Sequence, residues 1–453
     1  LSGFQQVVDE SSAERYLARM AAVPAFLDSL EAAVLHRESL GVLPPHIVVT
    51  RLIDRATVIT YMPSAEWAVH TAFVRHLEAL DLEPERAEAL SARNLELIDT
   101  VVRPAYQEYL AFMQALLDRA PAAVGLWSLP DGDAYYQELL RYYTTTDLTP
   151  DEIHELGLAR VVDLSEQMDA ALRELGYTDG DVAVRLELFV TSPEAVWEDA
   201  PGVREAILAE YRRLNDELQD KTASMFRGMP PQALESRRVP VENEVGAAGA
   251  YYWPPALDGT RPGIFYVNLR DISGTQRFAM RTLAAHEGIP GHHFETATGQ
   301  QLEGVPLVRR QDYIAAHSEG WALYAERLVA ELGLHDAFSD LGRLQAEMFR
   351  AVRLVVDTGM HARGWTREQS IDYMMAHTGM PRGEVVSEIE RYIANPGQAC
   401  AYMVGMLEIL ELREEARERQ GERFDMPAFH QVMIGNGALP LAVLRAEAER
   451  QLQ

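Results

Sequence analysis

The residues whose types and spacing could do chemistry are gathered in one short segment, HEGIPGHH at 286–293. This segment holds three of the chain's 13 histidines beside a carboxylate, that of Glu287. Neutral imidazole is the commonest protein ligand of zinc, and a carboxylate next to a ligand can take a proton from metal-activated water. The segment therefore predicts a zinc site in which Glu287 acts as the general base.

The spacing of these histidines differs from that of the usual zinc helix, H-E-x-x-H, because Pro290 occupies the fourth position after His286. On a straight helix His292 would lie about 240° around from His286, and His293 would share its face ~10 Å away. Pro290 cannot donate to the His286 carbonyl, and glycines flank it, so we expect a bend or bulge that returns His292 to His286. His293 is the fallback ligand if the backbone turns the other way. A helix end with surface histidines is the alternative interpretation.

A third ligand is predicted in the segment HSEGWALYAE at 317–326, which we expect to be helical. Glu319 and Glu326 share one face of such a helix. Carboxylates among large apolar residues are costly to bury unless they bind a cation or a base. Glu319 is the predicted ligand, since it lies 27 residues after His292 and leaves room for a loop and a second helix antiparallel to the first. Glu326 is predicted to orient a ligand histidine. A solvated edge of an amphipathic helix is the alternative.

Further candidates concern the substrate and the oxyanion that forms when water attacks a carbonyl. Tyr402 is the first candidate for donating a hydrogen bond to that oxyanion, with His361 behind it. A tyrosine packed in the core is the alternative interpretation of Tyr402. Tyr251, Tyr252 and Asn268 lie in strand-like pieces before the metal segment and are expected to line the substrate site, unless they only pack.

Two arginines within otherwise apolar helices, Arg353 and Arg413, are candidates for holding a substrate carboxylate through paired hydrogen bonds. Structural ion pairs with Asp357 or Glu414 would explain them equally well.

With these motifs in hand, the sequence resembles the bacterial family catalogued as domain of unknown function 885. The resemblance rests on HEGIPGHH, SEGWALYAE, GAYYWPPALDGTRPGIFYVN and NPGQACAYMVGMLEILELR, and covers the last half of the chain most closely. That family is similar to helical zinc peptidases of the thimet and Taq-carboxypeptidase types, which carry H-E-x-G-H and a downstream Glu. Matching Gly291-His292 to that Gly-His implies His292 as the ligand, a spacer two residues longer, and peptidase-like chemistry.

The elements that must position these residues are mainly helices, since apolar residues recur at three- and four-residue spacing along most of the chain. Thr149 and Thr366 precede capped helix starts. The predicted helices cover residues 13–38, 64–119, 132–144, 150–176, 202–226, 276–287, 311–332, 338–362, 366–377, 382–393 and 398–419.

Residues 237–272 break this pattern, because they combine β-branched and aromatic residues with Pro-Pro and Asp-Gly turn signals. We expect a small β-sheet there, with a hairpin around Asp258-Gly259. The predicted fold is a single, mainly helical catalytic unit with a zincin-like peptidase fold and a central cleft. Two lobes, 1–230 and 231–453, are a possible division.

Composition narrows the classes of partner. The chain has 69 acidic and 41 basic residues and a formal net charge of −28, which would repel nucleic acid and anionic membrane surfaces. No apolar run approaches the ~20 residues that a membrane span needs. A single cysteine, Cys400, excludes an intramolecular disulfide and a cysteine-based zinc cluster.

The chain opens at Leu1 without an initiator Met or an apolar leader, and the resembling family carries more sequence before this point. We therefore expect a native N-terminus that has been processed or truncated. The compartment, cytoplasmic or exported, does not follow from it.

These observations predict a Zn²⁺-dependent hydrolase, a metallopeptidase that cleaves short peptides. A metal-dependent hydrolase of non-peptide amides or esters would use the same ligands. A non-catalytic helical binding protein with a vestigial site is the alternative from another class. The sequence holds no G-x-S-x-G elbow, P-loop or dinucleotide fingerprint.

Overall fold

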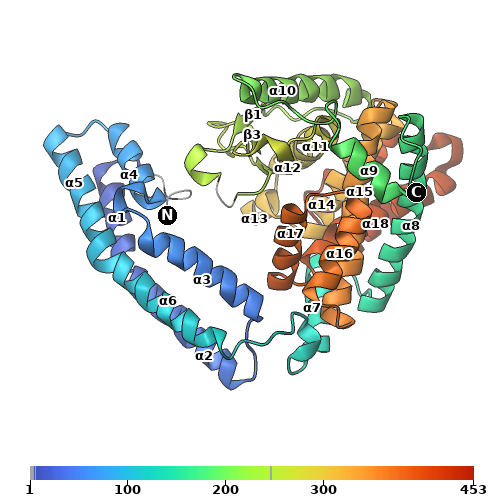
Figure 1. Ribbon diagram of the computed structural model, residues 1–453. Helices are drawn as coiled ribbons and strands as arrows, with labels where there is room; N and C mark the ends of the chain where they lie inside the picture. The colour runs from blue at the N-terminus through green and yellow to red at the C-terminus, as the bar shows by residue number, and fades with distance from the viewer. Residues whose placement is uncertain (1–4, 6, 245–246) are drawn as a thin grey trace. The chain divides into compact units, whose positions relative to one another are not determined.

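A computed structural model describes residues 5, 7–244 and 247–453 of the chain (Figure 1), so Leu1 and the piece of the expected sheet at 245–246 lie outside the described residues. The described chain is mainly α-helical and contains a three-stranded sheet. Its contacts divide it into two compact units. Unit 1 comprises residues 1–124 with 128–130, and unit 2 comprises residues 125–127 with 131–453.

The division thus falls about a hundred residues before the predicted boundary at residue 230. Residues 131–230 belong with the rest of unit 2 because two of their helices pack on its later elements. The long helix α8 (Pro150–Glu174) packs along α15 (Ala337–Ala362), and α10 (Val203–Thr222) packs on α11 (Met280–Glu287) and the sheet.

Unit 1 contains two buried apolar clusters held between its helices. The predicted helix at 13–38 is two helices that meet at Ala22, and the predicted helix at 64–119 is interrupted before Pro84. The helices of unit 1 are α1 (Glu10–Ala21), α2 (Val23–Ser39), α3 (His46–Tyr61), α4 (Ala68–Glu78), α5 (Pro84–Leu97) and α6 (Arg103–Leu117), with a π-helical turn, η2 (Ile98–Val102), between the last two.

Unit 2 carries all the predicted metal-site residues. The predicted capped starts are confirmed, because the hydroxyls of Thr149 and Thr366 each accept a hydrogen bond from the third helical amide. Cys400 is buried. The remaining helices are α7 (Gly132–Thr144), α9 (Val182–Val190), α12 (His292–Gln300), α13 (Leu307–Gln311), α14 (Ala315–Glu331), α16 (Arg367–Thr378), α17 (Arg382–Ala394), α18 (Ala401–Gln420), α19 (Met426–Ile434) and α20 (Leu441–Gln451).

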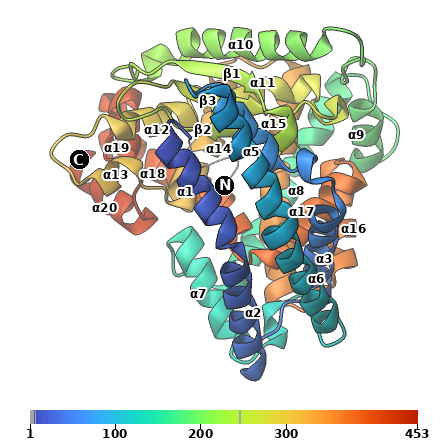
Figure 2. The same cartoon turned by 90° about the vertical axis from the view of Figure 1, so that its left-hand side faces the viewer.

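The sheet has the order β1-β3-β2 and comprises β1 (Leu234–Arg238), β2 (Ala250–Trp253) and β3 (Gly263–Val267). The central strand β3 runs parallel to β1 and antiparallel to β2. The β2–β3 connection contains Asp258-Gly259, which confirms the predicted hairpin. Helix α10 lies along the sheet in both views (Figures 1 and 2), and apolar residues of α10, β3 and α11 form one buried cluster. This cluster fixes α11 against the sheet.

Helix α14 is held against α18 at a crossing made of two glycines. A side chain on Gly405 would clash with the carbonyl oxygen of Ala316, and one on Gly320 would clash with the backbone of Gly405. Only glycine permits so close an approach. Because Glu319 is the neighbour of Gly320, this crossing fixes the turn of α14 that carries the predicted third ligand.

Candidate metal centre

The helix is interrupted between α11, which ends at Glu287, and α12, which begins at His292. The predicted bend at Pro290 is therefore confirmed, and the Ile289–Pro290 peptide bond is cis. A side chain on Gly291 would clash with the carbonyl oxygen of His286, so the return of the chain requires glycine at this position. The imidazole rings of His286 and His292 consequently lie with their centroids 4.8 Å apart.

Glu319 completes a compact group with these two histidines, and one ligand atom from each residue lies within 4.8 Å of the others. Oε2 of Glu319 lies 3.5 Å from Nε2 of His286 and 3.4 Å from Nε2 of His292. His286 is 4 % exposed and Glu319 8 %. Among the described residues, Oε2 of Glu319 is buried without a hydrogen-bond partner. Such an oxygen facing two imidazole nitrogens fits a cation between them.

The charges of the group favour the same interpretation. Burial lowers the pKa of His286, but the carboxylates of Glu319 and Glu326 outweigh it and raise this pKa to about 9. Glu319 likewise outweighs burial in raising the pKa of His292. In turn, the two histidines overcome burial and hold the pKa of Glu319 well below its usual range. The electrostatic potential beside the rings of His286 and His292 is therefore negative, because carboxylates surround both rings.

Glu326 lies where it was predicted, behind a ligand histidine. Its Oε1 is 2.7 Å from Nδ1 of His286. A carboxylate accepts hydrogen bonds, so Nδ1 carries the hydrogen and a neutral ring keeps its Nε2 lone pair for a metal. Glu287, at the end of α11, is 7 % exposed and interacts electrostatically with both His286 and His292. The predicted base is thus beside the predicted ligands.

Two residues of the site escaped prediction. The hydroxyl of Tyr313 donates to Oε1 of Glu319 at 2.6 Å, although most of this side chain is exposed. Tyr313 stands in a connection without any motif, so the sequence offered no signal for it. Glu295 is buried and accepts a hydrogen bond from Ser318 at 3.0 Å. Burial raises the pKa of Glu295 against the opposing effect of His292. Its position, one helical turn after His292, could have identified it from the sequence.

Tyr402 is brought to the edge of the group. Burial raises its pKa, and the second cause is the charge of Glu319. The guanidinium of Arg353 lies over its ring, 4.6 Å from the centroid. Tyr402 therefore combines a position near Glu319 with a cation on its face.

The assignment of His361 as a second oxyanion donor is corrected by the structure. This ring is fully buried, and its Nε2 donates to the carbonyl oxygen of Tyr392 at 3.2 Å. Its Nδ1 accepts from the backbone N–H of Leu126 at 3.3 Å. No N–H of the neutral ring is left for a substrate, so His361 has a structural role.

The ring of His293, the fallback ligand, is hydrogen-bonded to Gln232 and Tyr252 and not to Glu319. Its Nε2 lies 3.0 Å from the carbonyl oxygen of Gln232, and its Nδ1 lies 3.0 Å from the hydroxyl of Tyr252. Burial lowers the pKa of His293 to about 4, so the ring is neutral. Since a carbonyl only accepts, Nε2 donates and Nδ1 accepts from Tyr252. His293 and Tyr252 thereby join α12 to β2, and His292 alone turns to the metal group.

The other two predicted substrate residues in the sheet make structural contacts. Tyr251 points to the opposite face of β2 from Tyr252 and packs on the ring of Tyr266, 5.1 Å away. The side chain of Asn268 donates to the carbonyl oxygens of Glu244 and Ala247. Neither residue is brought to the metal group.

The two predicted carboxylate-binding arginines are in ion pairs, and the expected pair of Arg413 with Glu414 is present beside a closer one with Glu331. Both terminal nitrogens of Arg413 bind Glu331, at 2.7 and 2.8 Å, while Glu414 is 3.6 Å from its Nε. Arg353 pairs with Glu388 at 3.1 Å and not with Asp357. Arg413 is therefore a structural residue, whereas Arg353 keeps one unused nitrogen.

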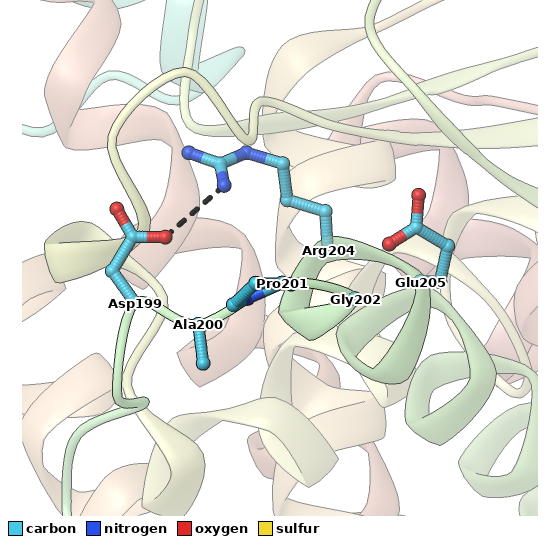
Figure 3. A pocket seen from close by; sticks show the side chains of 6 residues that line it. All are labelled: Asp199, Ala200, Pro201, Gly202, Arg204 and Glu205. Carbon is cyan, nitrogen blue, oxygen red and sulfur yellow. Dashed lines mark hydrogen bonds and ion pairs between the residues drawn. The ribbon is translucent and has the colours of Figure 1, made fainter.

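A surface hollow at the start of α10 contributes nothing to the metal group (Figure 3). Within it, Arg204 pairs with Asp199 at 3.2 Å. It is lined by Asp199, Ala200, Pro201, Gly202, Arg204 and Glu205.

These features define a mainly helical protein with a buried His-His-Glu group, and its sequence assigns it to a family. The chain belongs to the family described as bacterial protein of unknown function (DUF885), whose model matches residues 1–447. No curated protein matches the chain. No helix in the described part of the chain combines the length and the apolar character needed to cross a membrane.

Two solved structures are similar. The crystal structure of a protein described as a "putative lipoprotein" from Colwellia psychrerythraea is 38% identical, with a TM-score of 0.97. The match covers 100% of this chain and 78% of that one. A second, described as a "putative lipoprotein of unknown function" from Shewanella oneidensis, is 19% identical with a TM-score of 0.72, and the match covers 96% of this chain and 78% of that one. The second similarity shows a shared fold alone.

Proposed function

We propose that this protein is a zinc-dependent hydrolase, a metallopeptidase of zincin-like fold that cleaves short peptides. The observation that supports the proposal is the convergence of His286 Nε2 and His292 Nε2 on Oε2 of Glu319, which has no hydrogen-bond partner among the described residues. Two imidazoles and one carboxylate form the donor set of many catalytic zinc sites, which keep a fourth position open. The alternative of surface histidines is disfavoured, because both rings are largely buried and face a carboxylate.

The chain's own groups suit amide hydrolysis. A zinc ion in such a site polarises a carbonyl group and lowers the pKa of a coordinated water molecule. Glu287 is placed to take a proton from the attacking water and to deliver it to the leaving amine. Glu326 orients His286 from behind. The hydroxyl of Tyr402 is the candidate donor to the oxyanion. The hydroxyl of Tyr313 donates its one hydrogen to Glu319 and so orients that carboxylate.

Metal analysis combined with substrate profiling tests this proposal. The purified protein is expected to hold one zinc ion per chain and to cleave members of a short-peptide library, as followed by mass spectrometry. Treatment with a chelator should abolish cleavage, and added zinc should restore it. A chain that binds no stoichiometric metal would instead support a helical binding protein. Cleavage of amide or ester probes without cleavage of any peptide would support a non-peptide hydrolase.

We also propose that the protein is exported, on the description of the similar Colwellia psychrerythraea protein as a "putative lipoprotein". Fractionation of the source cells tests this, because an exported protein should leave the cytoplasmic fraction.

A further inference from the structure

Two guanidinium groups from one face of α15 flank the ring of Tyr402. Those of Arg350 and Arg353 lie 6.0 and 4.6 Å from its centroid. The same two groups lie over the ring of Phe349, at 5.4 and 4.1 Å. Because Tyr402 interacts electrostatically with Glu319, these cations are neighbours of the candidate metal centre.

Arg350 has few partners for a side chain that is only 14% exposed. Its Nη1 donates to the carbonyl oxygen of Ala346 in its own helix, at 3.2 Å. Its Nε is buried without a hydrogen-bond partner among the residues that the structure describes. The carboxylate in contact with it, that of Glu326, is 3.9 Å away and is already bound to His286 at 2.7 Å. Arg350 therefore retains hydrogen-bonding capacity.

Arg353 adds positive charge that its surroundings balance only in part. Its partner Glu388 also binds Arg391, at 2.8 Å. One nitrogen of Arg353, Nη1, is buried and unpartnered within the described part of the chain, and the whole residue is 5 % exposed. Three arginines thus share the carboxylates of Glu388 and Glu326. Two largely buried guanidinium groups beside a candidate catalytic site, each with a nitrogen that has no partner among the described residues, favour the binding of an anion.

Building on the proposed peptidase function, we propose that Arg350, supported by the charge of Arg353, binds the C-terminal carboxylate of a short peptide. A planar guanidinium matches a carboxylate with two parallel hydrogen bonds. Arg350 and His286 contact the same carboxylate, that of Glu326, and an extended peptide advances about 3.5 Å per residue. The C-terminal carboxylate of a peptide therefore reaches Arg350 when it lies a few residues beyond the scissile bond. Cleavage is then confined to bonds near the C-terminal end of the peptide.

Binding of three matched peptides tests this subsite. The probes are N-acetyl-Ala-Ala-Ala with a free carboxylate, the same peptide as its C-terminal amide, and N-acetyl-Ala-Glu-Ala amide, which carries a side-chain carboxylate instead. Calorimetry on the Glu287→Gln protein measures binding while the peptides stay intact. The free acid is expected to bind about 10- to 100-fold more tightly than either amide, the range for a charge-assisted hydrogen bond.

Arginine variants in the same background locate the effect. Arg350→Gln should make the acid and its amide bind alike. Arg343→Gln is the matched control, because Arg343 lies on the same helix, has a side chain that is 10% exposed against 14% for Arg350, and is paired with Asp340 and Glu347. It should keep the preference for the acid. Circular dichroism checks that each variant is folded, and the comparison of acid with amide on the parent protein needs no arginine variant.

The outcomes separate this subsite from the proposed function. Equal binding of the acid and its amide by the parent protein would overturn the subsite, even if zinc and hydrolysis are found. Tight binding of the amide that carries the Glu side chain would overturn the assignment to the C-terminus. A preference for the acid in a protein that hydrolyses no peptide would keep the subsite and refute the peptidase.

Discussion

Helix α14 contributes to two buried histidine clusters, which differ in the hydrogen-bond partners of their polar atoms. At the candidate metal centre, Glu319 faces His286 and His292 with an unpartnered oxygen. In the second cluster, the hydroxyl of Tyr324 donates to Nε2 of His430 at 2.8 Å, while Nδ1 of that ring, also at 2.8 Å, donates to the carbonyl oxygen of Met225.

The two clusters shift the pKa of their histidines in opposite directions. Burial lowers the pKa of His430 to about 4 because its partners are uncharged. The pKa of His286 rises to about 9 despite burial, because two carboxylates surround the ring. Residue types alone therefore do not mark a site. A surplus of negative charge and an oxygen without a donor mark the cluster that fits a cation.

The largest expected contrast is in metal content. His286→Ala should remove the bound zinc, because two ligands cannot replace the set of three. His430→Ala should keep it, although the protein will be less stable. Metal analysis of both folded variants by mass spectrometry measures the difference. Equal zinc contents would show that the two clusters do not differ as described here.

The next effect concerns catalysis without loss of metal. Glu287→Gln should lower the rate of peptide hydrolysis by about 10²- to 10⁴-fold, the usual contribution of a general base, while zinc stays bound. Glu303→Gln is the control, since Glu303 is exposed in the connection after α12. Rates and zinc contents of the two variants are compared. A fully active Glu287→Gln protein would refute the assigned base.

The His430 cluster predicts a pH dependence of stability. The unfolded ring takes up a proton near pH 6.5, whereas the folded ring does so only near pH 4. The unfolded state binds more protons in this window, so stability falls as the pH is lowered through it, by up to about 3 kcal/mol. The free energy of unfolding of the wild type and of His430→Gln, measured from pH 7 to pH 4, checks this. The wild type should lose more stability than the variant, and parallel curves would contradict the assignment.

The smallest expected effect is that of Glu326→Gln. An amide still accepts a hydrogen bond from Nδ1 of His286 but removes the charge that strengthens the ligand, so zinc affinity should fall about 10- to 100-fold. Competition with a chromogenic chelator measures this affinity. Glu331→Gln, on the same helix and paired with Arg413 in the other cluster, is the control. An unchanged affinity in Glu326→Gln would remove Glu326 from the site.

Much of the site could be read from the sequence because its signals are local. Gly-Ile-Pro-Gly between the histidines predicted a bend or bulge, and the helix is interrupted there. The spacing within α14 placed Glu319 and Glu326 on one face. Capping residues likewise marked the starts of α8 and α16. Helices α3, α9, α12, α19 and α20 lie outside the predicted ranges, as does α13 apart from Gln311. Of these, α3, α9, α19 and α20 pack against other helices of their own unit.

What the sequence determined by itself was the composition of the metal group and the elements that carry it, since motif spacing and turn chemistry act over a few residues. The tertiary structure alone decided which histidine nitrogens are taken up by hydrogen bonds and which face Glu319. His293 is occupied by Gln232 and Tyr252, and His361 by Tyr392 and Leu126, all far away in sequence. Whether a buried polar atom has a partner is a property of packing, and Oε2 of Glu319 and Nε of Arg350 are among the buried atoms that have none in the described part of the chain.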